Sequence, residues 1–325
     1  GLGDVYKRQE QAKKLIDQLV DYKCPVILFS GGEPLLREDL FELISYARHV
    51  GLKTVISTNG TLIDKTRAAK LAEAGVSYAG ISLDGPEPFH DNFRATKGSF
   101  QATMRGYANC LEAGIRMGLR FTITKHNADQ IEAVFDIAEN AEIRRICFYH
   151  LIRMGRAKDI QDSAPSLQQT RLAIDTIIDK TDQFVNDDLI DEVLTVGNHA
   201  DGPYLITRLQ RENSPLAPEA VNLLLANSGN RIGQNISSIG WDGEVYADQF
   251  WRNYSLGNVT KKTFTEIWDN SDDPVLHKLR NKDEYRDSRC AGCKWFDLCK
   301  GNFRFLGSDS SIENWQNEPA CYLTD

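Results

Sequence analysis

Four of the seven cysteines gather near the C-terminal end of the chain. Cys290, Cys293, Cys299 and Cys321 follow the pattern C-x2-C-x5-C-x21-C, in a segment with many turn-forming residues. A two-residue gap lets the chain fold into a knuckle that presents both sulfurs to one centre, and four thiolates suit either zinc or an iron-sulfur cluster. Zinc sites more often pair two such knuckles. The single knuckle therefore favours a [4Fe-4S] cluster over zinc without deciding between them; reduced buried cysteines or disulfides are the third alternative.

Small and polar residues follow three apolar runs in the first half of the chain. They are Ser-Gly-Gly-Glu-Pro at 30–34, Ser-Thr-Asn-Gly at 57–60 and Ser-Leu-Asp-Gly at 82–85. We call each of these three segments a tip, because it ends a predicted strand. Parallel-sheet proteins gather active-site groups at the carboxyl ends of their strands, although a tight strand-to-helix turn requires the same residue types. Three tips in series predict a functional rim.

The elements that position these tips alternate regularly. Short β-rich runs are predicted at 25–32, 53–60, 78–85, 118–124 and 145–151. Amphipathic helical patterns are predicted at 35–50, 63–74, 99–113 and 128–139. A repeat of about 25–30 residues of strand, loop and helix implies crossover units and a parallel sheet, as a βα barrel or a doubly wound sheet.

The remainder of the chain has a different pattern. We expect a helix at 167–184, a strand-like run at 191–197, helices at 218–225 and 263–270, and a hairpin at 235–248 turning at Asp242-Gly243. The expected divisions are 1–9, which we interpret as a non-native junction because it lacks an apolar period, and 10–165, a partial barrel with the alternating pattern. They are followed by 166–234, a helical bridging region, and by 235–325, the domain with the cysteine cluster. The first helix is expected to begin near Glu10.

Composition excludes several classes of protein. The chain has 325 residues, and its 46 acidic and 38 basic residues give a net charge of −8, which disfavours nucleic acid and anionic membranes as partners. Apolar stretches of about five residues are far below the ~18 that span a bilayer. An odd, clustered cysteine count fits a reducing cytoplasm, and Cys24, Cys110 and Cys147 are predicted to be small core residues.

The tips and the cysteine cluster together resemble the radical S-adenosylmethionine (SAM) enzymes that carry a SPASM-type C-terminal domain. The resemblance implies a partial (β/α)6 TIM-like barrel, truncated at its N-terminal side, followed by an iron-sulfur domain. It implies that the first tip contacts the methionyl amino group of SAM, through Gly31, Gly32, Glu33 and Pro34. It further implies ribose or carboxylate contacts from Thr58, Asn59, Ser82 and Asp84, with Arg105 as a candidate for the carboxylate.

The chain departs from the family pattern in two places. The C-x3-C-x2-C motif that binds the catalytic [4Fe-4S] cluster is absent, so the resemblance implies that the printed segment does not cleave SAM and that this cluster belongs to a longer product. Two further cysteines of the extended pattern are also missing, one at Phe303 and one in the hairpin at 246–248. We therefore expect one auxiliary [4Fe-4S] cluster, held by the four C-terminal cysteines with no open site.

A narrower resemblance concerns the substrate. Segments 148–151, 155–156, 194–202 and 248–251 look like those of radical SAM enzymes of modified tetrapyrrole synthesis, which act on didecarboxysiroheme in haem d1 formation or in siroheme-dependent haem formation. An anionic iron tetrapyrrole needs basic partners, apolar faces and an axial ligand or proton donor. The candidates are Arg153 and Arg156 for carboxylates, His150 and His199 for iron or protons, and Phe250 with Trp251 as a stacking wall or as hairpin core.

The chemistry that the resemblance implies is hydrogen abstraction by a 5′-deoxyadenosyl radical, with loss of a carboxylate-bearing side chain. An electron donor of the flavodoxin or ferredoxin type would supply electrons, and the auxiliary cluster would accept or relay one. Three alternatives are a radical SAM maturase acting on a peptide, a non-catalytic binding or scaffold protein, and a zinc-binding module.

Overall fold

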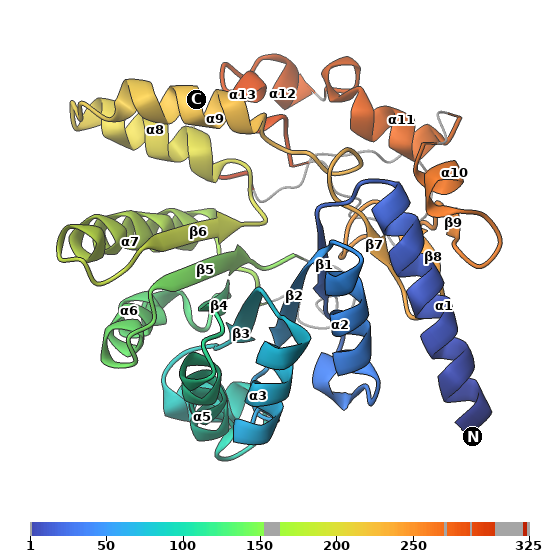
Figure 1. Ribbon diagram of the computed structural model, residues 1–325. Coiled ribbons are helices and arrows are strands. Elements are labelled where there is room, and N and C mark those ends of the chain that lie inside the picture. Colours follow the sequence, from blue (N-terminus) through green and yellow to red (C-terminus); the bar gives the residue numbers. More distant parts are fainter. Residues whose placement is uncertain (1, 153–162, 270–271, 287, 303–320, 324–325) are drawn as a thin grey trace. The chain divides into compact units, whose positions relative to one another are not determined.

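The structure, a computed structural model, describes residues 2–152, 163–269, 272–286, 288–302 and 321–323 (Figure 1). It divides into two compact units. The first comprises Gly1–Tyr149 with Asp175–Leu194, and the second comprises His150–Ile174 with Thr195–Asp325. Each unit is described by itself.

A six-stranded sheet with its strands in chain order is the frame of the first unit. The strands are β1 (Val26–Phe29), β2 (Lys53–Thr58), β3 (Tyr78–Ser82), β4 (Met117–Ile123), β5 (Arg145–His150) and β6 (Glu192–Val196). Pairing from β1 to β4 is parallel, with Ser57 opposite Gly80 and Ser82 opposite Arg120. The predicted α/β fold with a parallel sheet is confirmed.

Helices follow the strands along one side of this sheet (Figure 1). They are α1 (Leu2–Asp21), η1 (Pro34–Leu36), α2 (Leu40–His49), α3 (Lys65–Ala74), α4 (Glu87–Phe93), α5 (Ser99–Glu112), η2 (Ala128–Gln130), α6 (Ile131–Asn140) and α7 (Leu167–Asn186). The helix ends follow local chemistry: Asp64 caps α3 by accepting from the Arg67 N–H at 2.7 Å, and Gly75 ends it with φ of 91°.

Side chains alternate between the two faces of the sheet, because strand residues point to opposite sides in turn. Ile56, Ile81, Leu119 and Phe121 are fully buried on the helix-covered face. Residues of the other face are more polar and mostly only half-buried. We call that face the polar face and define it by Ser57, Gly80, Arg120, Arg145 and Tyr149.

Short helices and one small sheet form the second unit. The elements are α8 (Asp201–Arg211), α9 (Ala217–Asn227), β7 (Ser238–Ile239), β8 (Glu244–Tyr246), β9 (Gly257–Asn258), α10 (Phe264–Trp268), α11 (Pro274–Arg280), η5 (Lys282–Glu284), α12 (Ser288–Ala291) and α13 (Phe296–Cys299). Strands β7, β8 and β9 pair antiparallel. Gly243 donates to the Gly240 carbonyl at 3.0 Å in the turn, so the predicted hairpin is confirmed.

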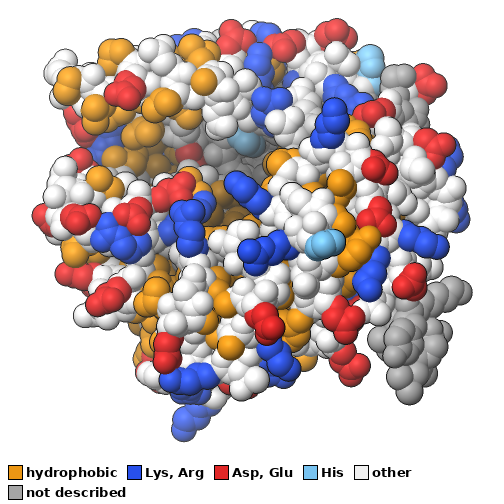
Figure 2. Space-filling view, viewed as in Figure 1, with side chains coloured by type: hydrophobic (Ala, Val, Ile, Leu, Met, Phe, Trp, Pro, Cys, Tyr) orange, Lys and Arg blue, Asp and Glu red, His pale blue; other side chains and the backbone are white. Residues whose placement is uncertain are grey.

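The second unit has its own apolar core. Trp251 is 3% exposed and packs with Ile152, Ile232, Val275 and Leu279, and Phe250 packs against this cluster. Trp251 is therefore a core residue of the second unit, as one of the two interpretations expected, and Phe250 packs against that core while it stays half-buried. Figure 2 shows apolar side chains at the surface around α8 and α9.

Three expectations about elements differ from the structure. The first helix begins at Leu2 and not near Glu10. The 191–197 run, which we placed in a bridging region, forms β6 at the edge of the main sheet, because a strand leaves its backbone groups unpaired unless it joins a sheet. Cys24 is only half-buried beside the thinly covered strand β1, whereas Cys110 and Cys147 are core residues as predicted.

Candidate functional site

Glu33 joins the tips of β1 and β2. Its Oε1 accepts from the Leu35 N–H at 3.1 Å and the Thr58 hydroxyl at 2.7 Å, and its Oε2 accepts from the Asn59 N–H at 2.8 Å. Pro34 is buried immediately behind it, at the first position of η1. The carboxylate therefore fixes two neighbouring tips in one arrangement.

Helix α5 also fixes the tip after β2, through one hydrogen bond and one close backbone contact. Thr103 donates to the Asn59 carbonyl at 2.9 Å. A Cβ at Gly106 would overlap the Gly60 carbonyl oxygen, so the helix can approach this closely only because residue 106 is glycine. Gly60 itself has φ of 77°.

Asp84, after β3, is the most buried carboxylate of the three tips at 4% exposure. Its Oδ2 pairs with the Arg94 Nε at 2.6 Å, and its backbone N–H donates to His90 Nδ1 at 3.1 Å. Asn127, which follows β4, donates to the Asp84 carbonyl at 3.1 Å. The Asp84 side chain thus secures its own loop and is already engaged by a guanidinium.

Gly31 and Gly32 present open backbone at the first tip. Both are exposed, and a Cβ at either would meet nothing within 4 Å. Gly31 has φ of 135°, which disfavours other residues. Ser82 is half-buried at the end of β3, whereas Arg105 lies exposed on α5, one residue from the close approach of Gly106 to Gly60.

The cysteine site lies in the second unit, at α12 and α13. Burial chiefly, and also the neighbouring Cys293 and Cys321, raise the pKa of the Cys299 thiol to about 11, while the Gly301 N–H donates to its Sγ at 3.3 Å. Among the described residues, no three His, Cys, Asp or Glu side chains are already assembled as a metal-binding set. Cys293 and Cys321 are close enough to Cys299 to influence its pKa, but the three thiols are not gathered around one point, and Cys290 precedes them on α12.

Cys299 is anchored by the loop after α9. Asn230 donates its backbone N–H to the Cys299 carbonyl at 2.9 Å and its side-chain amide to the Gly301 carbonyl at 2.8 Å. A Cβ at Gly229 would approach the Cys299 backbone too closely, and Gly229 has φ of 62°. This loop fixes the backbone on both sides of one sulfur.

Tyr322 anchors the last predicted ligand, Cys321. Its ring is fully buried, and its hydroxyl donates to Asp201 Oδ1 at 2.6 Å. His150 Nε2 lies 2.9 Å from Asp201 Oδ2, and Arg171 donates to the Tyr322 carbonyl at 2.9 Å. Burial pushes the pKa of Asp201 up, but His150, Tyr322 and Thr195 outweigh it and hold the pKa below its usual value.

The two candidate histidines differ in their burial and in the hydrogen bonds that the structure gives them. The His150 ring, at the end of β5, is buried and bound to Asp201. His199 is half-buried, and its backbone N–H donates to Asn302 Oδ1 at 2.7 Å. Arg153, Arg156 and the position of Phe303 lie outside the described residues.

Comparison with known proteins gives the family. The radical SAM superfamily profile matches residues 3–138, and that of the SPASM iron-sulfur cluster-binding domain matches residues 231–294. An Fe-coproporphyrin III synthase of Methanosarcina barkeri is 49% identical over 97% of this chain and 80% of its own length. The chain belongs to the radical SAM superfamily and carries a SPASM domain.

Other relatives extend this assignment. A pre-heme d1 synthase of Dinoroseobacter shibae is 33% identical over 97% of this radical SAM chain and 78% of its own length. The structure of Streptococcus suis SuiB bound to S-adenosylmethionine matches with a TM-score of 0.70 at 19% identity, covering 90% of this chain and 65% of that one. At that identity the likeness shows the fold.

The family assignment implies SAM and [4Fe-4S] clusters as cofactors, and the residues present fit SAM and one auxiliary cluster. Soft thiols that form no disulfide among the described residues, with an N–H donor on one sulfur, are what an iron-sulfur cluster requires. Open glycine backbone beside a fixed carboxylate suits the zwitterionic end of SAM. The expectation that the printed segment is inactive is not borne out, because relatives named as synthases align along 97% of it.

Sequence reasoning missed several residues of the two sites. Arg94 and Asn127, which hold the Asp84 loop, lie in segments for which we predicted no role. Tyr322 and Asp201 were also missed. A signal existed for Tyr322, because it directly follows a predicted ligand, but nothing local marks Asn127 as buried.

Proposed function

We propose that this radical SAM protein forms an iron coproporphyrin by removing carboxylate-bearing side chains from didecarboxysiroheme. The observation that carries the proposal is a contrast within one organism. The Fe-coproporphyrin III synthase of Methanosarcina barkeri is 49% identical to this chain, whereas an AdoMet-dependent heme synthase of the same organism is 27% identical over a similar span. Pre-haem d1 formation is the second candidate function, because the pre-heme d1 synthase of Dinoroseobacter shibae is 33% identical to this chain.

The chain's own residues have distinct parts in this proposal. Gly31, Gly32 and Glu33 would bind the amino group of SAM, with Thr58, Asn59 and Ser82 at the neighbouring tips and Asp84 fixing its loop. Arg105 stays a candidate for the SAM carboxylate. SAM and its cluster, when bound, supply a 5′-deoxyadenosyl radical, and the tips hold its source in place.

The second unit would hold the auxiliary cluster through Cys290, Cys293, Cys299 and Cys321. His199 and His150 stay candidates for contact with the tetrapyrrole, His150 through the Asp201 pair that keeps its ring in place. Arg153 and Arg156 are proposed to bind substrate carboxylates. A flavodoxin or ferredoxin is proposed as the electron donor. A cytoplasmic location is consistent with cysteines that form no disulfide among the described residues. No described helix is both long and apolar enough to cross a bilayer.

The test is anaerobic incubation of the iron-loaded protein with SAM, a reductant and didecarboxysiroheme, followed by mass spectrometry. We expect iron coproporphyrin III together with 5′-deoxyadenosine. Loss of propionate groups in place of acetate groups would favour the haem d1 candidate. Because a mycofactocin maturase of Mycolicibacterium smegmatis is 29% identical over 90% of the chain, precursor peptides are the control substrate. Formation of 5′-deoxyadenosine with a peptide alone would overturn the proposal.

A further inference from the structure

Arg120 lies in the middle of the polar face of the first unit. It is half-buried on β4, one of its guanidinium nitrogens donates to the Ser57 hydroxyl, and its guanidinium lies 5.4 Å from the centre of the Tyr149 ring. These three residues come from β2, β4 and β5. The guanidinium is therefore held at one place by groups from three strands.

Gly80 makes room for this arrangement. A Cβ at Gly80 would overlap the Arg120 Nε and Cδ, so the side chain lies directly over the β3 backbone. Register explains the contact, because Ser57 pairs with Gly80 while Arg120 itself pairs with Ser82, two residues further along β3. The Arg120 side chain thus extends along the sheet from the position of Ser82, with which its backbone pairs, to the position of Gly80.

The charge of Arg120 is not balanced by any described group. Its hydrogen-bond partner is a hydroxyl and its ring neighbour is a phenol. Burial raises the pKa of Tyr149 well above its usual range, so that phenol stays neutral. Within the described part of the chain, no carboxylate lies at ion-pair distance from Arg120.

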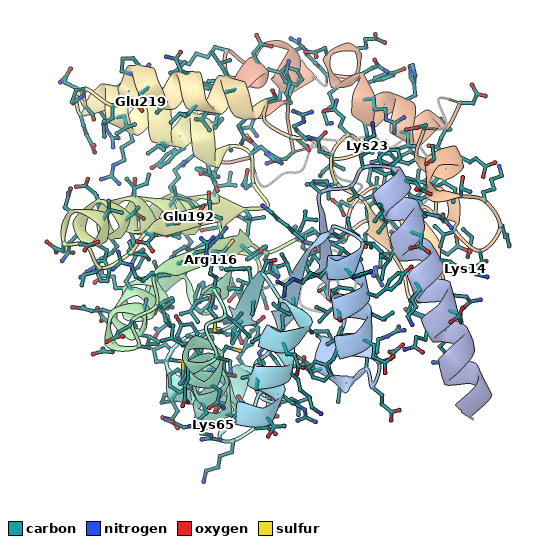
Figure 3. All side chains as sticks on the ribbon, in the orientation of Figure 1. Lys14, Lys23, Lys65, Arg116, Glu192 and Glu219 are labelled. Carbon is teal, nitrogen blue, oxygen red and sulfur yellow. The ribbon has the colours of Figure 1, made fainter. Side chains whose placement is uncertain are left out.

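Arg145, on the same face, shows the balanced arrangement. Its Nε lies 3.0 Å from Glu192 Oε2, and its guanidinium lies 4.7 Å from the centre of the Tyr78 ring. Glu192 comes from β6 (Figure 3). Both arginines lie near a tyrosine ring on the polar face, and only Arg145 has a carboxylate partner among the described residues.

Taking a guanidinium out of water is costly unless an anion repays the cost, and its planar fork of donors matches a carboxylate. We propose that Arg120, oriented by Ser57 and Gly80, is a binding site for a ligand carboxylate on the polar face of the sheet. The assignment of this carboxylate to the tetrapyrrole rests on the proposed function. The methionyl end of SAM carries the same group, so the test has one arm for each source.

The first arm measures binding of iron coproporphyrin III, and of its tetramethyl ester, to the iron-loaded protein by absorbance titration. We expect Arg120→Gln to weaken binding of the free acid by about tenfold or more, Arg120→Lys to weaken it less, and the ester to bind equally to wild type and both variants. Arg145→Gln is the matched control, with binding within about twofold of wild type.

The second arm measures SAM binding by equilibrium dialysis with the same variants. A loss confined to SAM would support the carboxylate site with SAM as its source. Unchanged affinity for both ligands in Arg120→Gln, or equal losses for the free acid and the ester, would overturn the site. If wild type binds no tetrapyrrole, the proposed function fails by itself, and the SAM arm then decides on Arg120.

Discussion

A buried lysine in the second unit shows how one side chain can connect two distant segments. Lys282 is 3% exposed, and its ammonium donates to the Ile232 carbonyl at 3.0 Å and to the Leu279 carbonyl at the end of α11. Both partners are neutral. Burial, and then the nearby Arg231, therefore lower the pKa of Lys282 to about 8.

This shift predicts a pH-dependent stability. Because the folded pKa lies below the unfolded value of about 10.4, the unfolded chain binds more protons between about pH 8 and pH 10.4, and stability rises with pH there. The difference in unfolding free energy between wild type and Lys282→Met should shift by about 2 kcal/mol in favour of wild type from pH 8 to pH 10, measured by urea unfolding.

The exposed Lys262 supplies the control for that measurement. The unfolding free energies of Lys262→Met and wild type should differ by the same amount at both pH values, because the Lys262 side chain is exposed to solvent on the same unit. A Lys282→Met difference that stays constant between pH 8 and pH 10 would show that the ammonium is not desolvated in the folded protein.

Residue types and spacing could be read from the sequence, but their partners could not. The thiol pattern and the polar tips are local, so the family resemblance followed from them. Asp84 was assigned to SAM contact because its position matches the motif, yet its carboxylate pairs with Arg94, ten residues away. The Asp201–Tyr322 bond joins residues 121 positions apart, and no local pattern encodes a contact of that length.

Elements were predictable where hydrophobic period and turn chemistry agreed. The five predicted strands all exist. The first three end two or three residues earlier than predicted, because Gly31, Gly60 and Gly85, with positive φ, turn the chain out of the sheet. The strand predicted at 118–124 lies at 117–123 and the one at 145–151 ends at 150.

Helices α4, α8 and α11 were not predicted. Asp201 and Gly202 read as loop residues, but Pro203 in the first turn is compatible with a helix, and tertiary packing of Ile206 decides the outcome.

The contact between α5 and the tip of β2 carries a prediction at this scale. Gly106→Ala raises helix propensity by about 1 kcal/mol, so an isolated helix would gain stability. In the folded protein the new Cβ overlaps the Gly60 carbonyl, and α5 or the tip must move. We expect a net loss of about 1–3 kcal/mol in urea unfolding and weaker SAM binding.

Ala108→Gly separates these two effects. It lies exposed on the same helix and should cost about 1 kcal/mol through propensity alone, leaving SAM affinity unchanged. If Gly106→Ala is more stable than wild type and binds SAM with unchanged affinity, the tip after β2 does not depend on its close contact with α5.

At the scale of the molecule, two units carry the two halves of the proposed chemistry. The first places the tips on a rigid parallel sheet. The second has Cys290 and Cys299 on the short helices α12 and α13, and its ligand segments are held by Asn230 and by the Asp201–Tyr322 pair. Iron bound to these thiols would stabilise the cysteine segments, because ligand binding to the folded state stabilises it.

The iron prediction follows from this division. Cys299→Ser should lose the iron and sulfide of one cluster and the matching absorbance near 400 nm, because a serine hydroxyl replaces a soft thiolate among buried groups. Cys110→Ser, at a cysteine that is also buried but lies in the first unit, should keep them. A colourless wild type containing zinc would refute the cluster.

Hydrogen exchange then tests the division between units. Chelation of the iron should increase exchange at the amides of Asn230 and Gly301, which bond around Cys299, while the amides between β2 and β3 keep their protection. The reason is that the sheet is held by its own backbone pairing, whereas the cysteine segment depends on the sulfurs being tied together. Uniform loss of protection in both units would mean that iron stabilises the chain as a single cooperative unit.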